Sequence, residues 1–160
     1  MALPAGPMIT LTVALEASYT LQATDGTQKQ IDAVDFVLGN HQNILSEGEA
    51  LRGVHIPAYA LRKRHAHRRF CLTKMGRSTI FMIATQTPET DDMVLTITAA
   101  TTRPIRLRFD QRPGPAQLRD AIEALPDELW FADANGTPAH RRHLARHYAE
   151  EMRAELGAST

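Results

Sequence analysis

The most concentrated set of reactive side chains in the sequence is a basic run that begins at Arg62 and ends at Arg69. It holds five Arg or Lys residues and two histidines. Guanidinium groups form paired, charge-assisted bonds with phosphate oxygens, so the run has the chemistry of a phosphate site. Three interpretations stay open: a solvated edge strand whose charges prevent edge-to-edge pairing, a cofactor or subunit boundary, and a nucleic-acid surface. The last is the weakest, because Phe70 alone is not a stacking platform.

A second candidate is a group of histidines and acids near the end of the chain, whose spacings of three and four would place them on one helical face. The group comprises His140, His143, His147, Glu150 and Glu151. A metal ion could in principle be held there, but Arg141 and Arg146 repel a cation. We therefore expect a solvated, histidine-rich face and no metal site. His65 and His67 lack a third ligand and make a poorer site still.

The sequence contains no motif for covalent catalysis and no glycine-rich loop that would bind phosphate. Cys71 is the only cysteine, and its place beside an apolar run favours a small core residue over a nucleophile. Gly76-Arg77-Ser78 has the composition of an ordinary turn, although its backbone N–H groups could also receive an anion. We expect no catalytic residue on this chain.

The composition of the chain limits its possible partners and its location. The chain has 160 residues, enough for one core, and its 18 basic residues balance 18 acidic ones, so no overall field favours nucleic acid or an anionic membrane. A single cysteine cannot form an internal disulfide. The N-terminus lacks the basic region of a signal peptide, and no stretch approaches the length of a membrane span. We expect a cytoplasmic protein that contacts no membrane.

The elements that must position these side chains follow from periodicity. Alternation with a period of two indicates strands in the first two thirds of the chain, and a short helical stretch is predicted over residues 32–38. The predicted strands cover residues 9–15, 19–22, 51–57, 62–73, 80–84, 93–99 and 105–109. We expect the strand at 19–22 to pair with the one at 9–15. A turn at Asp25-Gly26 follows, because Gly26 tolerates positive φ.

After Pro115 the spacing becomes helical. One helix ends before Pro126, and a second begins at Thr137-Pro138, with Thr137 as N-cap. The apolar stripe of the second helix, spaced by four, consists of Leu144, Tyr148, Met152 and Leu156. The order of strands and then helices predicts an α+β fold, an antiparallel β-sheet region followed by a small helical C-terminal region.

Four segments, taken in order, carry a family resemblance. The first is Ala2-Leu3-Pro4 leading into residues 9–21, and the third runs from Arg69-Phe70 to Ile80. The second and most specific is Gly26-x-x-x-x-Ile31-x-Ala33-x-Asp35-Phe36-x-x-Gly39 followed by Leu45-x-x-Gly48-Glu49-x-Leu51-x-x-Val54-x-Ile56-Pro57. The fourth is Asn135-Gly136-Thr137-x-x-x-Arg141-Arg142-x-Leu144-Ala145. Together they resemble the C-terminal part of the FAD-binding (medium) subunit of molybdenum hydroxylases of the carbon monoxide dehydrogenase and xanthine dehydrogenase type.

The resemblance implies a domain division and a set of flavin contacts. Residues 1–60 would be the C-terminal part of the FAD-binding subdomain, and residues 61–160 the flavoprotein C-terminal domain, with strands in 62–109 and helices in 115–157. Leu51 falls on the leucine that packs near the flavin in the family. Four departures stand at other contact positions: Ala50 replaces a larger aliphatic residue, Cys71 a lysine, Pro7 an aspartate, and Arg77 opens a stretch that replaces an acidic one. These five residues are the cofactor-binding candidates.

The resemblance also implies a function. The chain would be a fragment or truncated form of an electron-transfer subunit that passes electrons between iron–sulfur centres and an external acceptor. The iron–sulfur centres and the molybdenum cofactor are expected on partner subunits. The family's glycine-rich loop around the flavin diphosphate would lie before Met1, so we expect FAD to bind this chain weakly or not at all. Two alternatives stay open, a cofactor-free module for subunit interaction and, more weakly, nucleic-acid binding through the run from Arg62 to Arg69.

Overall fold

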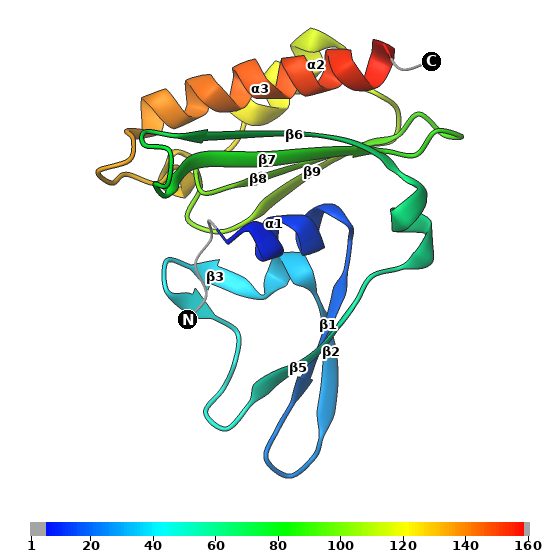
Figure 1. The fold of residues 1–160 in the computed structure, drawn as a ribbon, viewed down its shortest axis with the longest axis vertical. Helices are drawn as coiled ribbons and strands as arrows, with labels where there is room; N and C mark the ends of the chain where they lie inside the picture. Colours follow the sequence, from blue (N-terminus) through cyan, green and yellow to red (C-terminus); the bar gives the residue numbers. More distant parts are fainter. Residues whose placement is uncertain (1–5, 159–160) are drawn as a thin grey trace.

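A computed structural model describes residues 6–158 of the chain and confirms the α+β fold (Figure 1). The helices are α1 (Pro7–Ala14), α2 (Pro115–Glu123) and α3 (Pro138–Ala158), and the short 3-10 helices are η1 (Ala33–Asp35), η2 (Ala58–Arg62) and η3 (Asp127–Leu129). The strands are β1 (Ser18–Gln22), β2 (Gln28–Asp32), β3 (Val37–Gly39), β4 (Gln42–Asn43), β5 (Ala50–His55), β6 (Arg64–Cys71), β7 (Ser78–Gln86), β8 (Met93–Thr98) and β9 (Ile105–Phe109). The first family-like tripeptide, Ala2-Leu3-Pro4, lies outside the described residues.

The main layer is an antiparallel sheet with the strand order β6-β7-β8-β9. Helices α2 and α3 cover one face of this sheet, and α1 lies on the other (Figure 1). Every residue of β8 is buried, because a central strand that is covered on both faces is buried on both sides. The predicted strands at 62–73, 80–84, 93–99 and 105–109 are thereby confirmed.

The C-terminal helices bury the stripes that their spacing predicts. Leu118 and Ile122 of α2 and Leu144, Met152 and Leu156 of α3 are buried in one hydrophobic cluster with the sheet. The Thr137 hydroxyl accepts a hydrogen bond from the His140 N–H over 3.3 Å, which is the N-cap that the sequence predicts.

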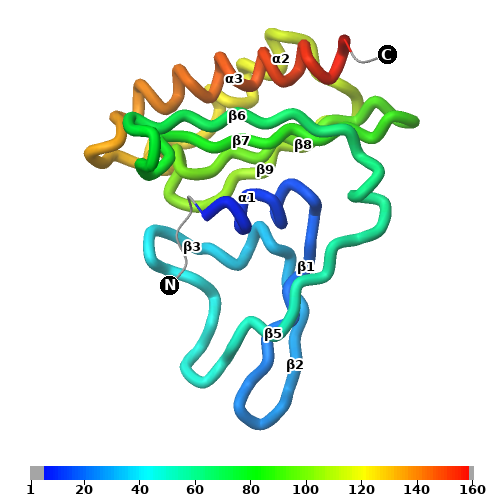
Figure 2. The backbone as a smooth tube through the Cα atoms, viewed as in Figure 1, coloured from blue at the N-terminus to red at the C-terminus, as the bar shows by residue number. Residues whose placement is uncertain are grey.

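A smaller sheet with the order β2-β1-β5 extends away from the main layers (Figure 2). Its hairpin turns at the predicted place, since the Thr27 N–H donates to the Asp25 carboxylate over 2.8 Å and Gly26 adopts a φ of 87°. A second hydrophobic cluster joins this part to α1; it contains Val13, Ala17, Tyr19, Leu21, Ala33, Phe36 and Val37. The division into two domains at residue 60 stays a prediction.

The strand predicted over residues 9–15 is wrong, because these residues form helix α1 and the start of the turn after it. Pro7 occupies the first turn, where its missing N–H costs nothing. Thr10 and Thr12 donate their hydroxyls back to Gly6 and Met8 carbonyls over 3.2 and 2.8 Å and are buried, so the alternation of apolar residues with threonine did not mark a solvent face. Strand β1 consequently pairs with β2 and β5.

The helical stretch predicted over residues 32–38 is also wrong. Asp32 is extended, with φ −68° and ψ 142°, and only Ala33–Asp35 form a single 3-10 turn before β3 begins. The Ala33 N–H donates to the Ala17 carbonyl over 2.9 Å. This bond continues the pairing of β1 with β2, in which Ser18 pairs with Asp32, and so holds the start of the stretch in an extended conformation.

Candidate functional site

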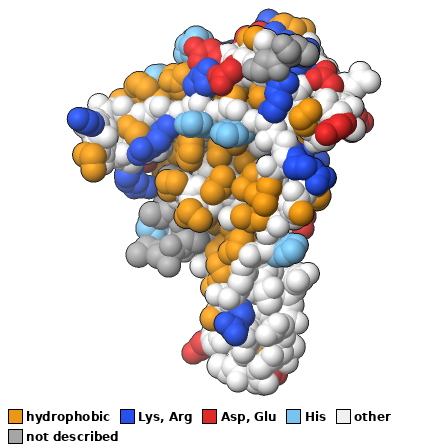
Figure 3. Space-filling model, turned by 45° about the vertical axis from the view of Figure 1, so that its right-hand side comes forward, with side chains coloured by type: hydrophobic (Ala, Val, Ile, Leu, Met, Phe, Trp, Pro, Cys, Tyr) orange, Lys and Arg blue, Asp and Glu red, His pale blue; other side chains and the backbone are white. Residues whose placement is uncertain are grey.

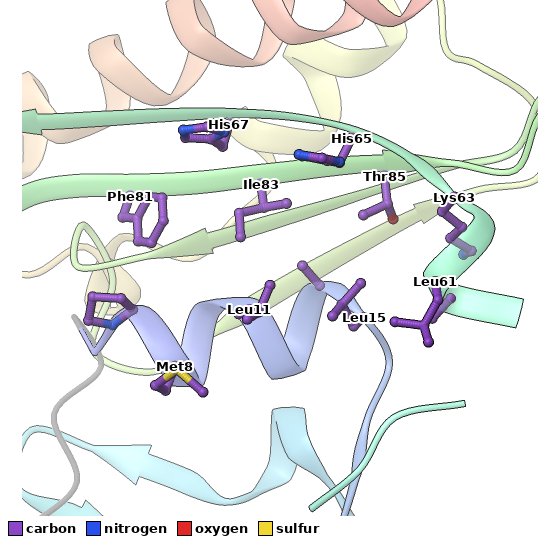
Figure 4. A pocket seen from close by; sticks show the side chains of 13 residues that line it. Met8, Leu11, Leu15, Leu61, Lys63, His65, His67, Phe81, Ile83 and Thr85 are labelled. Atoms are coloured by element: carbon purple, nitrogen blue, oxygen red, sulfur yellow. The ribbon is translucent and has the colours of Figure 1, made fainter. Parts of the chain in front are cut away.

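The side of the molecule that carries α1 has two joined apolar grooves. The upper groove, of about 470 Å³, lies between α1, η2 and the strands β6 and β7 (Figure 4). The close-up view shows Leu11 from α1, Leu15 directly after it, Leu61 from η2, and Phe81 and Ile83 from β7 around the groove. These segments are distant in the sequence, so the groove exists only in the folded chain.

The lower groove, of about 330 Å³, lies between α1 and strand β5. Leu51, Val54 and Ile56 form its wall, and Met8 and Leu11 line both grooves. In the space-filling view, hydrophobic side chains gather below two histidines and continue toward the hairpin at the base (Figure 3). The two grooves are therefore parts of one apolar surface, which we call the α1 face.

Few polar groups interrupt the α1 face. Thr85 is 1% exposed, and its hydroxyl has no hydrogen-bond partner among the described residues. His65 and His67 lie on the rim with their rings stacked, 6.4 Å between centroids (Figure 4). Such a surface can bind apolar groups, and among the described residues that line it no nucleophile is paired with a base.

At one end of the upper groove Lys63 enters a charge network. Its ammonium contacts the Glu16 carboxylate over 2.6 Å, and Arg108 contacts the same carboxylate. Burial alone would raise the pKa of Glu16, but the hydrogen bonds and charges of Lys63 and Arg108 outweigh it, so the pKa is lowered. The network joins the end of α1 to the main sheet. It occupies Lys63, which makes this lysine a structural residue.

The structure does not bring the five cofactor-binding candidates together at one site. Pro7 lines the upper groove and Leu51, 41% exposed, lines the lower one. Ala50 is exposed at the start of β5, Cys71 is half-buried at the end of β6, and Arg77 lies in the following turn. Ala50, Cys71 and Arg77 line neither groove. Contact of any of the five with a flavin stays a prediction.

Sequence reasoning missed the residues that dominate the α1 face. Leu11 was assigned to a strand, and Met8 and Leu61 were given no role. The sequence signal for helix α1 is Pro7, since proline is favoured in the first turn of a helix. No local pattern identifies Leu61, which is 70% exposed, because its neighbours come from other parts of the chain.

From Arg64 onward the basic run lies in β6, an edge strand of the main sheet, which agrees with the edge position of the first interpretation. Arg68 bridges to Glu151 over 2.7 Å and to Glu155 over 2.8 Å, and so ties α3 to the strand. Arg69 donates to the Ser78 hydroxyl over 2.7 Å. With the ion pair between Lys63 and Glu16 included, several cations of the run are bonded within the chain.

The histidines of α3 do not converge on one point. His140 packs edge-on against Phe70, with 6.0 Å between ring centroids, and His147 contacts Glu151 over 3.1 Å. Among residues 6–158 no three histidine, cysteine or acidic side chains come together as a metal site would require. None of the helices described combines the length and apolar character needed to cross a membrane.

Comparisons with known proteins give a likeness of fold. No family model matches the sequence, and no curated protein matches it. Among solved structures, a chain of carbon monoxide dehydrogenase from Hydrogenophaga pseudoflava is 17% identical with a TM-score of 0.80, over 98% of this chain and 57% of that one. A chain of reconstituted CO dehydrogenase from Oligotropha carboxidovorans is 17% identical with a TM-score of 0.80, over 99% of this chain and 58% of that one.

Quinoline 2-oxidoreductase from Pseudomonas putida 86 is a third such structure, 18% identical with a TM-score of 0.73, over 97% of this chain and 57% of that one. At these identities the likeness concerns the fold. The chain spans less than three fifths of each solved chain that it matches.

Proposed function

We propose that this chain is one portion of the flavin-binding unit of a molybdenum-hydroxylase-type oxidoreductase, which passes electrons between iron–sulfur centres and an external acceptor. The observation that carries the proposal is the fold shared over 97–99% of the chain with chains of two carbon monoxide dehydrogenases and a quinoline oxidoreductase. The sequence segments that resemble the flavin subunit also support the proposal.

The α1 face fits one part of FAD. A flavin ring system is flat and largely apolar, and the joined grooves offer apolar walls from Leu11, Leu51 and Phe81. The diphosphate does not fit, because the sequence has no glycine-rich loop to replace its water with backbone N–H donors. When bound, FAD supplies the electron-transfer chemistry, and this chain's residues contribute only position and exclusion of water.

The proposal includes partners and a location. The molybdenum-binding and iron–sulfur subunits of the complex are the expected partners, and the single cysteine, Cys71, suits the reducing cytoplasm. The substrate would be set by the molybdenum subunit, so this chain's residues do not define it.

The first test is a flavin titration of the isolated chain, followed by flavin fluorescence. We expect a Kd for FAD above about 10 μM, because the diphosphate finds no donors here. The second test is purification of the chain from the cells that produce it, under conditions that preserve complexes. Stoichiometric flavin with iron and molybdenum in the same assembly is the expected result. An assembly without flavin and without molybdenum would contradict the proposal.

A cofactor-free interaction module is the second candidate function. The observation that favours it is the exposed α1 face, since contiguous apolar surface on a soluble protein marks interaction sites. Flavin content of the native assembly separates the two, because only the first candidate requires it. Nucleic-acid binding is disfavoured, since Lys63, Arg68 and Arg69 already bond within the chain.

A further inference from the structure

We infer that a hollow between helices α2 and α3 binds a phosphate group, which the guanidinium groups of Arg119 and Arg146 and the imidazoles of His143 and His147 would hold. The hollow lies on the helix-covered face of the main sheet, opposite the α1 face (Figure 1). A ligand bound there would leave both grooves of the α1 face open.

The four side chains come from two helices. Arg119 lies on α2, whereas His143, Arg146 and His147 lie on α3 at spacings of three and four, which place them on one face of that helix. Both helices pack into the same hydrophobic cluster, and the four side chains line one hollow of about 320 Å³. Each of them can donate hydrogen bonds from nitrogen and none carries an acidic oxygen, so the hollow suits an oxygen-rich anion.

Two of the carboxylates near the hollow are neutralised by arginines that do not line it. Glu150 accepts two hydrogen bonds from Arg153, over 2.8 and 2.6 Å. Glu151 accepts from Arg68 over 2.7 Å and contacts His147 over 3.1 Å. Because Arg68 and Arg153 lie outside the hollow, these two acids cancel little of the positive charge within it.

Glu123 is the carboxylate that competes for the hollow. It accepts from Nη1 of Arg146 over 2.6 Å, and in the described part of the chain Nε and Nη2 of Arg146 have no partner. Arg119 makes no hydrogen bond or ion pair there. Its charge acts on Glu150, whose pKa is lowered chiefly by the side-chain hydrogen bonds from Arg153 and further by the charges of Arg153 and Arg119, against the effect of burial. One guanidinium charge therefore lacks a bonded counter-ion.

The arrangement of these donors favours phosphate over a carboxylate. One guanidinium fork already satisfies the two oxygens of a carboxylate. A phosphate ester offers three acceptor oxygens and about two negative charges, so it can accept from Arg119, from Arg146 and from an imidazole together. Since the lining side chains are exposed or half-buried, water and salt weaken the attraction, and we expect a Kd of about 1 mM for inorganic phosphate.

A smaller hollow of about 70 Å³ adjoins the first, since Arg119 and Arg146 line both. Pro115 and Leu118 give it an apolar floor, and Leu118 is 2% exposed. A small hydrocarbon group attached to the bound anion could lie there. The ligand is therefore either free phosphate or the phosphate ester of a small molecule.

The test is a titration of the ¹⁵N-labelled full chain with sodium phosphate at about pH 7.5, followed by amide chemical shifts, with sodium chloride at the same ionic strength as reference. We expect saturable shifts centred on Arg119, His143, Arg146 and His147, which chloride does not reproduce. Ethyl phosphate is titrated in the same way. A lower Kd for ethyl phosphate than for inorganic phosphate identifies an ester as the ligand, and an equal or higher Kd identifies free phosphate. Both results support the site.

Three substitutions then test the roles of the side chains. Arg119→Gln should raise the Kd for phosphate by about tenfold, because a charge-assisted hydrogen bond is lost. Glu123→Gln should lower it by about threefold, because Arg146 is freed from its carboxylate. Arg52→Gln is the matched control, since Arg52 is an exposed arginine on β5 of the smaller sheet, and should change the Kd by less than about twofold. Arg119 and Glu123 are also exposed, so all three variants should keep the circular dichroism spectrum of the parent chain.

Three results would overturn the phosphate site. The first is a set of shifts that chloride reproduces, and the second is a titration that does not saturate up to roughly 50 mM phosphate. The third is an equal effect of Arg119→Gln and Arg52→Gln on the Kd, which would mean that phosphate responds only to the overall charge of the chain.

Discussion

Arg141 is the largest fully buried side chain among those described, at 0% exposed. Its guanidinium donates to the Thr79 carbonyl over 2.9 Å, to the Ala99 carbonyl, and to the Gly136 carbonyl over 3.2 Å, and it pairs with the Asp133 carboxylate. A buried charge is tolerable only when its donors are satisfied in this way. Arg141 of the family-like motif therefore stabilises the fold.

Arg141→Met is expected to lower the free energy of unfolding by about 3–5 kcal/mol, because Asp133 and the carbonyls lose a buried partner. Arg146→Ala, on the same helix, is the control. Its ion pair with Glu123 is exposed, so a loss below about 1 kcal/mol is expected. Urea unfolding measures the free energy of unfolding of both variants. Equal losses would show that the buried Arg141 contributes no more to stability than the exposed Arg146.

Leu51→Ala tests whether this residue is part of the core or of the lower groove. Leu51 is 41% exposed, while Leu21, its register partner on β1, is 1% exposed. We expect Leu51→Ala to lower the free energy of unfolding by less than about 1.5 kcal/mol and Leu21→Ala by about 2–5 kcal/mol. Chemical denaturation decides the point. A loss at Leu51 as large as at Leu21 would assign it to the core.

At the scale of elements, helix α1 depends on its threonines. The hydroxyls of Thr10 and Thr98 bond over 2.7 Å between the helix and β8, and both residues are fully buried. The helix thus places a polar stripe against the sheet and leaves Met8 and Leu11 outward. This orientation is what creates the α1 face.

Thr10→Val is expected to cost about 1–2 kcal/mol, because the Thr98 hydroxyl loses a buried partner. In the double variant Thr10→Val, Thr98→Val both groups are apolar, so the loss should be smaller than the sum of the two single losses. A double-mutant cycle measured by urea unfolding checks this. Strict additivity would mean that the hydroxyl pair contributes nothing to the position of α1.

At the scale of the whole molecule, Glu16 connects the smaller part of the fold to the main sheet. Glu16 follows α1, whereas its partners Lys63 and Arg108 stand just before β6 and on β9. Asp92 also approaches Lys63, at 3.8 Å. The pKa of Glu16 is lowered in the folded chain, so its contribution to stability depends on pH.

Glu16→Gln should lower the free energy of unfolding by about 2 kcal/mol near pH 7. Because the folded pKa lies below the ordinary value of 4.5, the carboxylate stabilises the fold fully above that value and loses its effect as the pH falls through the folded pKa. The difference between Glu16→Gln and the parent chain should therefore shrink in acid. Urea unfolding at about pH 7 and about pH 3.5 measures it, and a difference that stays constant would contradict the assignment.

The sequence by itself determined the strands of the main sheet, the two C-terminal helices and the hairpin turn at Gly26. In the helices the local period matches the side that is buried, and in β7 and β8 a short apolar run matches burial on both sides. Thr137 and Pro138 act on the start of their own helix. It also selected Leu51 from a motif, although not the groove that Leu51 lines. Local patterns predict the structure of a segment when residues close to it in the sequence fix its conformation.

Only the tertiary structure decided the rest. The alternation of threonine with apolar residues from Ile9 onward suits a strand or a helix, and the choice is made by contacts with Tyr19 and Thr98, residues that belong to other elements. The α1 face follows from that choice, since Met8, Leu61 and Val54 become neighbours only when α1 lies between the two sheets. The periodicity of a segment indicates which of its residues lie on the same face. Whether that face is buried depends on the other segments that pack against it.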